Sequence, residues 1–118
     1  MSEHNKLGEE GEERARHFLV SNSYKILELN WRYNHKEIDI IAELNDYIVV
    51  IEVKTRSSDF FDDITTVITN KKKRYLIEAT EAYIEKHNIT KEIRFDLIFI
   101  SNNNIEHIEE AFNSFDVC

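Results

Sequence analysis

Hydrophobic and polar positions alternate most clearly in residues 37–56, where two runs rich in Ile and Val flank Asn45-Asp46. β-Branched side chains favour pleated strands, and Asn and Asp tolerate the positive φ angles of a tight turn. The pattern therefore predicts a β-hairpin with its turn centred on Asn45-Asp46.

This register gathers four charged side chains on one face of the hairpin, because side chains alternate along a strand. Asp39 is expected opposite Glu52, and Glu37 is expected opposite Lys54 as its ion-pair partner. Directly opposed like charges, with Cβ atoms about 4.5–5.5 Å apart, destabilise a sheet. A divalent cation would turn that repulsion into a binding site, since Mg²⁺ takes oxygen ligands from one or two carboxylates and water.

A solvated sheet face is the alternative interpretation, because exposed strand faces often alternate acidic and basic residues. Ile41, Ile48 and Val50 lie on the same face and argue against it. Charges set into a largely apolar sheet are costly unless they are paired or bound to a metal. Lys54, two residues beyond Glu52, is placed to hold a phosphate or an attacking water.

The segment before the hairpin predicts a helix followed by a strand. Apolar residues recur at helical spacing over residues 7–21, and Tyr24–Tyr33 follows as the first strand. Gly8 and Gly11 are the only glycines of the chain, and each costs a helix about 1 kcal/mol relative to Ala. We therefore expect both to allow close packing on the sheet. Glu12 lies beside the apolar face, where the pattern alone favours an ordinary solvated helix glutamate.

The segment after the hairpin predicts a second long helix, whose N-cap we expect to be Asn70. A strand–helix–strand passage of this length suits a right-handed parallel crossover. The predicted elements are an exposed loop over Ser57–Asp63, a helix over Asn70–His87, a strand over Ile93–Ser101 and a short edge strand or turn over Ile105–Phe112.

The opening of this second helix carries the one basic block of the chain. Cations in a first turn oppose the helix dipole, and a bound phosphate would resolve that conflict. The alternatives are a solvated basic turn or a helix that begins earlier, near Asp63. The candidates for phosphate contacts are Lys71, Lys72, Lys73 and Arg74, together with Arg56.

Three aromatic residues each have more than one interpretation. Trp31 could stack on a nucleobase, although large aromatic side chains more often belong to the core or cover the sheet. Phe60 and Phe61 could wedge into a nucleic acid, bury themselves in a dimer contact or fold back over the core.

Composition and charge limit the class of protein. A chain of 118 residues, 42% hydrophobic and 32% charged, predicts one globular domain over residues 1–118. The sequence has no apolar run long enough to span a bilayer and no apolar segment of the kind that forms the core of a signal peptide. Its single cysteine, Cys118, cannot form an internal disulfide, and this favours a cytoplasmic location. The net charge of −8 speaks against a general nucleic-acid binder, but the acidic residues include the proposed metal ligands. The five histidines lack the close spacing of a zinc site.

Several motifs resemble those of the YraN-like family (UPF0102), which consists of small, largely uncharacterised bacterial proteins. Asp39 followed by Glu52-Val53-Lys54 resembles the PD-(D/E)XK signature of restriction-endonuclease-like nucleases. Lys36 and Ser23 depart from the family, which usually has Gly at both places, and this bears on turn geometry. The other similar stretches are Leu7-Gly8, Gly11-Glu12, Ala15, Asn30-Trp31-Arg32, residues 37–42, Thr55-Arg56, Arg94-Phe95-Asp96 and residues 107–112.

The resemblance implies an α/β fold with a mixed β-sheet flanked by helices, in the order α-β-β-β-α-β, related to Holliday-junction resolvases. It implies a metal-dependent endonuclease that hydrolyses DNA phosphodiester bonds, at branched or recombination intermediates. Asp39, Glu52 and, directly or through water, Glu12 would bind Mg²⁺ or Mn²⁺. Lys54 would position and activate the attacking water. The alternative is a non-catalytic nucleic-acid- or protein-binding module with the same fold. A homodimer follows by analogy with resolvases, and no membrane partner is expected.

Overall fold

The computed structural model describes residues 3–56, 67–102 and 104–116. The predicted loop over Ser57–Asp63, with Phe60 and Phe61, lies outside the described residues, as do the alternative helix start near Asp63 and Cys118. The elements are α1 (Glu3–Ser21), β1 (Lys25–Tyr33), β2 (Lys36–Leu44), β3 (Tyr47–Thr55), α3 (Asn70–His87), β4 (Glu92–Ile100), β5 (Ile105–Phe112) and a 3-10 turn (Ser114–Asp116).

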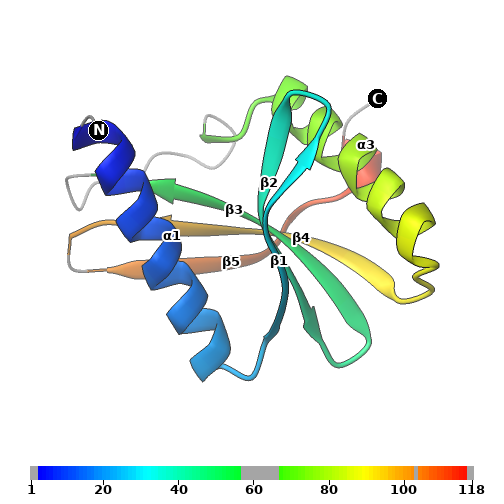
Figure 1. Ribbon diagram of the computed structural model, residues 1–118, viewed down its shortest axis with the longest axis horizontal. Helices are drawn as coiled ribbons and strands as arrows, with labels where there is room; N and C mark the ends of the chain where they lie inside the picture. Colours follow the sequence, from blue (N-terminus) through cyan, green and yellow to red (C-terminus); the bar gives the residue numbers. More distant parts are fainter. Residues whose placement is uncertain (1–2, 57–66, 103, 117–118) are drawn as a thin grey trace.

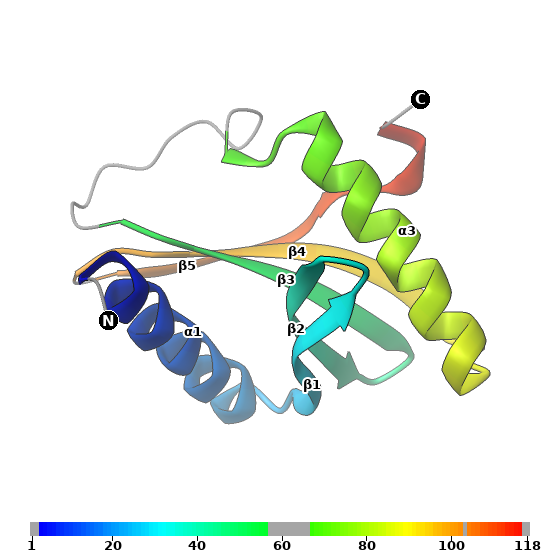
Figure 2. The ribbon, with the colours of Figure 1, turned by 45° about the horizontal axis from the view of Figure 1, so that its top comes forward.

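The five strands form one mixed sheet in the order β1-β2-β3-β4-β5 (Figure 1). β3 and β4 are parallel and the other neighbours are antiparallel, so the passage from β3 through α3 to β4 is the predicted parallel crossover. α1 and α3 lie on opposite faces of the sheet (Figure 2). The expected mixed α/β architecture is confirmed, and residues 105–112 form an edge strand rather than a turn.

Each face of the sheet has its own hydrophobic core. Leu76, Ala79 and Tyr83 of α3 pack over one face, and Ala15 and Leu19 of α1 pack over the other. The central strands are therefore buried on both faces, which explains why their sequences are nearly continuous apolar runs.

The second long helix has the predicted bounds, Asn70–His87, but a different N-cap. Its N-cap is Thr69 rather than Asn70, because Thr69 has extended backbone angles (φ −72°, ψ 160°) and its side chain accepts a hydrogen bond from the Lys72 N–H at 3.1 Å. The helix ends at His87, and Asn88 follows as its C-cap with a left-handed φ of 53°. None of the helices in the described part of the chain is long and apolar enough to cross a membrane.

The two glycines of α1 play different parts. A Cβ at Gly11 would lie 2.2 Å from Thr55 Oγ1, so Gly11 allows the predicted close approach of α1 to β3. The prediction is wrong for Gly8, where a Cβ would meet no heavy atom within 4 Å. The close approach at Gly11 matters for the site because the next residue is Glu12.

Candidate functional site

β2 and β3 keep the predicted hairpin register up to the point where they separate. Ile40 pairs with Ile51 and Leu44 pairs with Tyr47, around a turn in which Asn45 has a φ of 52°. Past the Ile40–Ile51 pair, on the side away from the turn, β2 remains paired with β1 and β3 remains paired with β4. The sheet therefore opens between β2 and β3 (Figure 1). We call this opening the fork.

Two polar residues occupy the fork and account for the separation. Asp39 Oδ2 accepts a hydrogen bond from the Val53 N–H at 2.8 Å, so a side chain takes the place of a carbonyl from the neighbouring strand. Asn30, across from Asp39 on β1, has a φ of 50° and interrupts the ladder on the other side. Ile38 and Ile41 both enter the core under α3, so the predicted regular alternation breaks at Asp39.

The three predicted metal ligands approach the fork from three elements, and Asp39 and Glu52 form its centre. Glu52 is only 3% exposed, and its Oε1 has no hydrogen-bond partner among the described residues. Burial raises the pKa of Asp39 to about 8, and the charges of Glu52 and Glu12 add to the effect while the Val53 N–H opposes it. An ionised Asp39 is therefore disfavoured unless a cation lies beside it.

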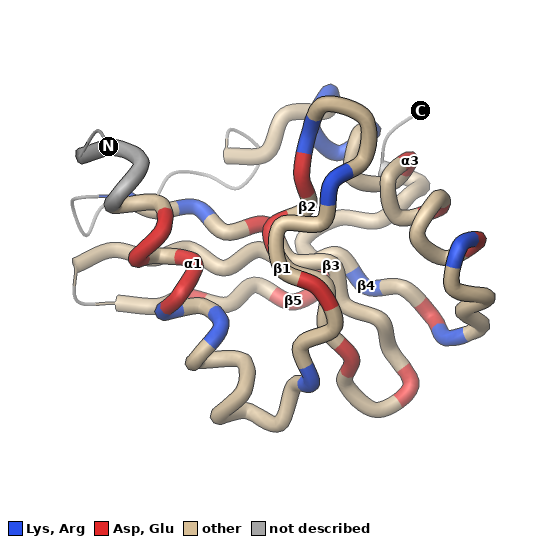
Figure 3. Tube along the Cα trace, in the orientation of Figure 1, with Lys and Arg blue, Asp and Glu red and all other residues tan. Residues whose placement is uncertain are grey.

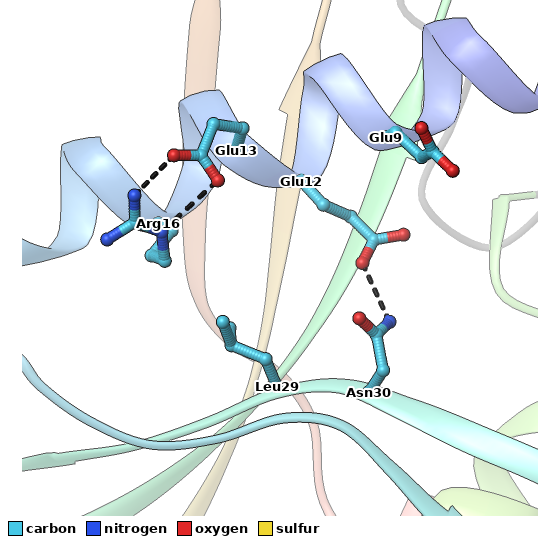
Figure 4. A pocket seen from close by; sticks show the side chains of 6 residues that line it. All are labelled: Glu9, Glu12, Glu13, Arg16, Leu29 and Asn30. Carbon is cyan, nitrogen blue, oxygen red and sulfur yellow. Dashed lines mark hydrogen bonds and ion pairs between the residues drawn. The ribbon is translucent and has the colours of Figure 1, made fainter.

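Glu12 belongs to the edge of the fork rather than to its centre. Its Oε1 accepts a hydrogen bond from Asn30 Nδ2 at 2.8 Å (Figure 4). It lines a depression between α1 and β1 in which Glu13 is paired with Arg16. As the side chains stand, no three His, Cys, Asp or Glu residues in the described ranges form a group that could hold a metal ion.

Two lysines offset the charge of Glu52. Lys54 Nζ lies 3.3 Å from Glu52 Oε2, and Lys72 Nζ, from the first turn of α3, lies 3.7 Å from the same oxygen. The predicted pair of Glu37 with Lys54 is wrong. Glu37 instead forms an ion pair with Arg32 on β1 at 3.5 Å, because β2 has already left β3 at that point.

The side chains of the basic block at the start of α3 do not all point the same way. Lys72 reaches the fork, whereas Lys73 Nζ lies 5.7 Å from the centre of the Phe112 ring at the end of β5. Lys71 and Arg74 are exposed. Lys72 is therefore the member of the block that the fold brings to the carboxylates.

A groove along the end of β3 extends the fork toward the N-terminal turns of α1. Lys54, Thr55 and Arg56 line it, opposite Leu7 and Gly8. The Arg56 guanidinium lies over the Phe99 ring, 5.6 Å from its centre, and Nη1 donates to the Thr55 carbonyl at 3.1 Å. Arg56 is thus held at the mouth of the groove by its own strand and by β4.

A second charged cluster, around the buried Asp96, is satisfied internally. Asp96 accepts hydrogen bonds from Arg94 Nε at 3.0 Å, from Arg94 Nη2 at 2.9 Å and from the Glu110 N–H at 3.0 Å, and it pairs with His107 Nε2 at 2.7 Å. Burial alone would raise its pKa, but the bonds from His107 and Arg94 outweigh burial and hold the pKa below its usual value. The cluster ties β5 to β4, which is a structural role.

Sequence reasoning missed Asn30, which orients Glu12, and a group of aromatic residues beside Lys72. Tyr75 donates a hydrogen bond to the Tyr33 carbonyl at 2.9 Å, and Lys36 lies over the Tyr75 ring. The signal that could have found this group is the mixture of aromatic and basic residues in both 31–36 and 71–75.

Comparison with known proteins identifies relatives along nearly the whole chain. A family model described as "Uncharacterised protein family UPF0102" matches residues 11–100. A UPF0102 protein of Phocaeicola vulgatus is 43% identical over 116 residues, covering 95% of this chain and 96% of the relative. Similar proteins occur in Flavobacterium johnsoniae (42% over 123 residues, 98% and 100% covered) and Persephonella marina (44% over 107 residues, 90% and 92% covered).

Proposed function

This chain belongs to the uncharacterised protein family UPF0102, and we propose that it is a metal-dependent endonuclease of the restriction-endonuclease-like, PD-(D/E)XK type, related to Holliday-junction resolvases. Its substrate is DNA, at branched or recombination intermediates. The observation that carries the proposal is the pair of carboxylates at the fork, Asp39 and Glu52, set among the buried apolar residues of β2 and β3 beside Lys54.

The donor set fits a hard divalent cation, Mg²⁺ or Mn²⁺. Both carboxylates supply oxygen atoms, and the buried Glu52 Oε1 has no partner in the described part of the chain. Mg²⁺ commonly uses one or two protein carboxylates and fills its other positions with water and phosphate oxygens. Asp39 and Glu52 would hold the cation, with Glu12 completing its surroundings directly or through water.

The chemistry divides between the cation and Lys54. A divalent cation supplies Lewis-acid chemistry, since it acidifies water and neutralises charge on a phosphate. Lys54 lies on β3 two residues beyond Glu52, so its side chain is on the same face of the strand. From there its ammonium group can donate a hydrogen bond to the attacking water and orient it. The burial of Asp39 and Glu52 limits competing solvent at the reacting phosphorus.

Binding of the DNA backbone falls to the basic side of the fork. Lys72 from α3 and Arg56 from the groove of β3 flank the carboxylates, and Lys71 and Arg74 extend the positive charge along the surface. Lys73 is less well placed because it lies over Phe112. Since the chain as a whole carries a charge of −8, affinity for DNA should depend on these local contacts.

A cleavage assay with a matched variant tests the proposal. We expect the parent to cut branched, single-stranded or duplex DNA in Mn²⁺, and Lys54→Ala to lose about 10²- to 10⁴-fold in rate, the usual range for an acid–base or positioning group. Circular dichroism of both proteins controls for folding. Metal-independent binding without cleavage of any substrate would instead identify a non-catalytic binding module.

A further inference from the structure

The tip of the β1–β2 hairpin and the first turns of α3 meet in a surface of three half-buried aromatic rings, Trp31, Tyr33 and Tyr75, which we call the aromatic strip. The Trp31 and Tyr33 rings are nearly parallel (8°) with centroids 6.2 Å apart, and the Tyr33 and Tyr75 centroids are 6.4 Å apart. Figure 1 shows the hairpin tip beside the start of α3, where Tyr75 donates a hydrogen bond to the Tyr33 carbonyl. Two segments more than 40 residues apart in sequence thus build one continuous surface.

Cations are interleaved with these rings. Lys36 Nζ lies 5.4 Å and Lys72 Nζ 5.5 Å from the centre of the Tyr75 ring. The basic residues of the hairpin tip and of the start of α3 gather here (Figure 3). Because Lys72 also reaches Glu52 at 3.7 Å, the aromatic strip begins one side chain away from the fork.

All three rings lie partly buried against the core under α3. Trp31 lies edge-on against Tyr83 at 5.1 Å and belongs to the core under α3, which confirms the core interpretation of this residue. Tyr33 and Tyr75 are only partly covered, and two lysines lie against Tyr75. Of the nearby carboxylates, Glu37 is engaged by Arg32, and Glu78 accepts a hydrogen bond from the Tyr33 hydroxyl at 3.5 Å.

The opposite side of the fork has the reverse character. The depression between α1 and β1 is lined by Glu9, Glu12 and Glu13, and its one cation, Arg16, is paired with Glu13 (Figure 4). A phosphate backbone is repelled by such a surface. A strand that passes the fork is therefore directed toward the aromatic strip.

We propose that the aromatic strip, with Lys36 and Lys72, binds an unpaired stretch of DNA next to the fork. Bases of a duplex are already stacked and paired, whereas unpaired bases can stack on Tyr33 and Tyr75 while their phosphates contact the lysines. The inference deepens the proposed function and rests on it, because it assigns the fork a substrate with unpaired nucleotides beside the cleaved bond. Stacking tolerates any base, so little sequence preference is expected.

Binding in the presence of a chelator tests the strip without cleavage. Fluorescence anisotropy would compare a short labelled single-stranded DNA, the blunt duplex of the same length and single-stranded RNA of the same sequence. We expect the parent to prefer the single-stranded DNA. Tyr33→Leu should weaken that binding by about tenfold, within the range for loss of one stacked base, and leave duplex binding within about twofold. Tyr33→Phe, which keeps the ring, should bind like the parent.

Three results would overturn the proposal: no preference for single strands, equal losses for Tyr33→Leu on single strands and duplex, or tighter binding of RNA than of DNA. If Tyr33→Leu fails to fold, as judged by its melting curve, Lys36→Gln takes its place, because Lys36 is exposed. That variant should weaken single-strand binding and reduce its dependence on salt.

Cleavage by the parent in Mn²⁺ separates the two claims. Tyr33-dependent binding of single strands without cleavage would support the aromatic strip and contradict the nuclease. Cleavage that requires Lys54, with no effect of Tyr33→Leu on binding, would support the nuclease and contradict the aromatic strip.

Discussion

At the scale of single residues, Asp39 combines requirements that conflict without a cation. It is largely removed from solvent and lies beside Glu52. Its carboxylate also accepts the hydrogen bond of the Val53 N–H, which a backbone carbonyl of the neighbouring strand would otherwise accept. The hydrogen bond favours the ionised carboxylate, but burial and the neighbouring charge disfavour it more strongly and raise its pKa to about 8. Strain of this kind is typical of functional sites.

This pKa predicts how the stability of the metal-free protein depends on pH. Asp39 ionises near 3.8 in the unfolded chain and near 8 in the folded one, so between these values the native state holds a proton that the unfolded state has lost. The contribution of Asp39 is therefore fully present below about pH 4 and is lost as pH rises toward 8, by at most about 1.4 kcal/mol per pH unit.

Urea unfolding in chelator at several pH values measures this slope. Asp39→Asn keeps an oxygen that can accept from Val53 but cannot ionise, so its stability should fall less than that of the parent between pH 5 and pH 8. Parallel curves for the two proteins would show that Asp39 does not titrate in this window.

Two neighbouring lysines give a second prediction at the scale of residues. Lys72→Gln and Lys73→Gln remove the same charge from the same helical turn, but only Lys72 faces the fork. Lys72→Gln should weaken DNA binding and reduce the slope of log affinity against log salt by about one, as expected for one lost phosphate contact. Titrations at several salt concentrations that left the slopes of both variants equal to that of the parent would assign the block to solvent.

At the scale of elements, the contact of α1 with β3 depends on Gly11. Its absent Cβ leaves room for Thr55, whereas Gly8 faces open space three residues earlier. Gly11→Ala should lower the melting temperature and displace Glu12 from Asn30, reducing cleavage. Gly8→Ala should be neutral or stabilise by up to about 1 kcal/mol, because Ala is the better helix former. Thermal melts of both variants measure the difference, and equal effects would contradict the close contact.

The elements also show how far the sequence could predict the structure. The Ile- and Val-rich runs and the turn at Asn45 were sufficient for the hairpin register from Ile40–Ile51 to Leu44–Tyr47. The opening of the sheet beyond Ile40 could not be predicted, because it depends on the left-handed backbone of Asn30 and on the Asp39 bond to Val53. Periodicity treats both residues as ordinary strand positions.

Contacts between distant segments were likewise beyond the reach of sequence patterns. The pattern of residues 70–87 was sufficient to predict α3, yet it could not indicate that Lys72 would meet Glu52 or that Tyr75 would meet Tyr33. Such pairs are set by how the crossover helix lies on the sheet, which is a tertiary property. Sequence patterns therefore predicted the charged residues of the candidate site, but not the contacts of Asn30 with Glu12 and of Tyr75 with Tyr33 at its borders.

At the scale of the whole molecule, the fork divides surfaces of opposite charge. A chain with a net charge of −8 places one group of basic residues at the hairpin tip and the start of α3, and acidic residues of α1 line the other side (Figure 3). This separation of charge favours a bound DNA strand that leaves the fork over the basic surface. It also limits non-specific binding of DNA to the acidic surface.

The stability of the whole molecule gives the most direct test of the central claim, that Asp39 and Glu52 form a cation site. The measurement is a set of four melting curves near pH 8, for the parent and Asp39→Asn, each in chelator and in Mg²⁺ or Mn²⁺. We predict that Asp39→Asn melts higher than the parent in chelator, because the carboxylate repulsion is removed. The metal should raise the melting temperature of the parent and hardly change that of Asp39→Asn, since only the native parent gains binding energy. Equal metal-induced shifts in the two proteins would show that Asp39 is not a ligand and would contradict the account.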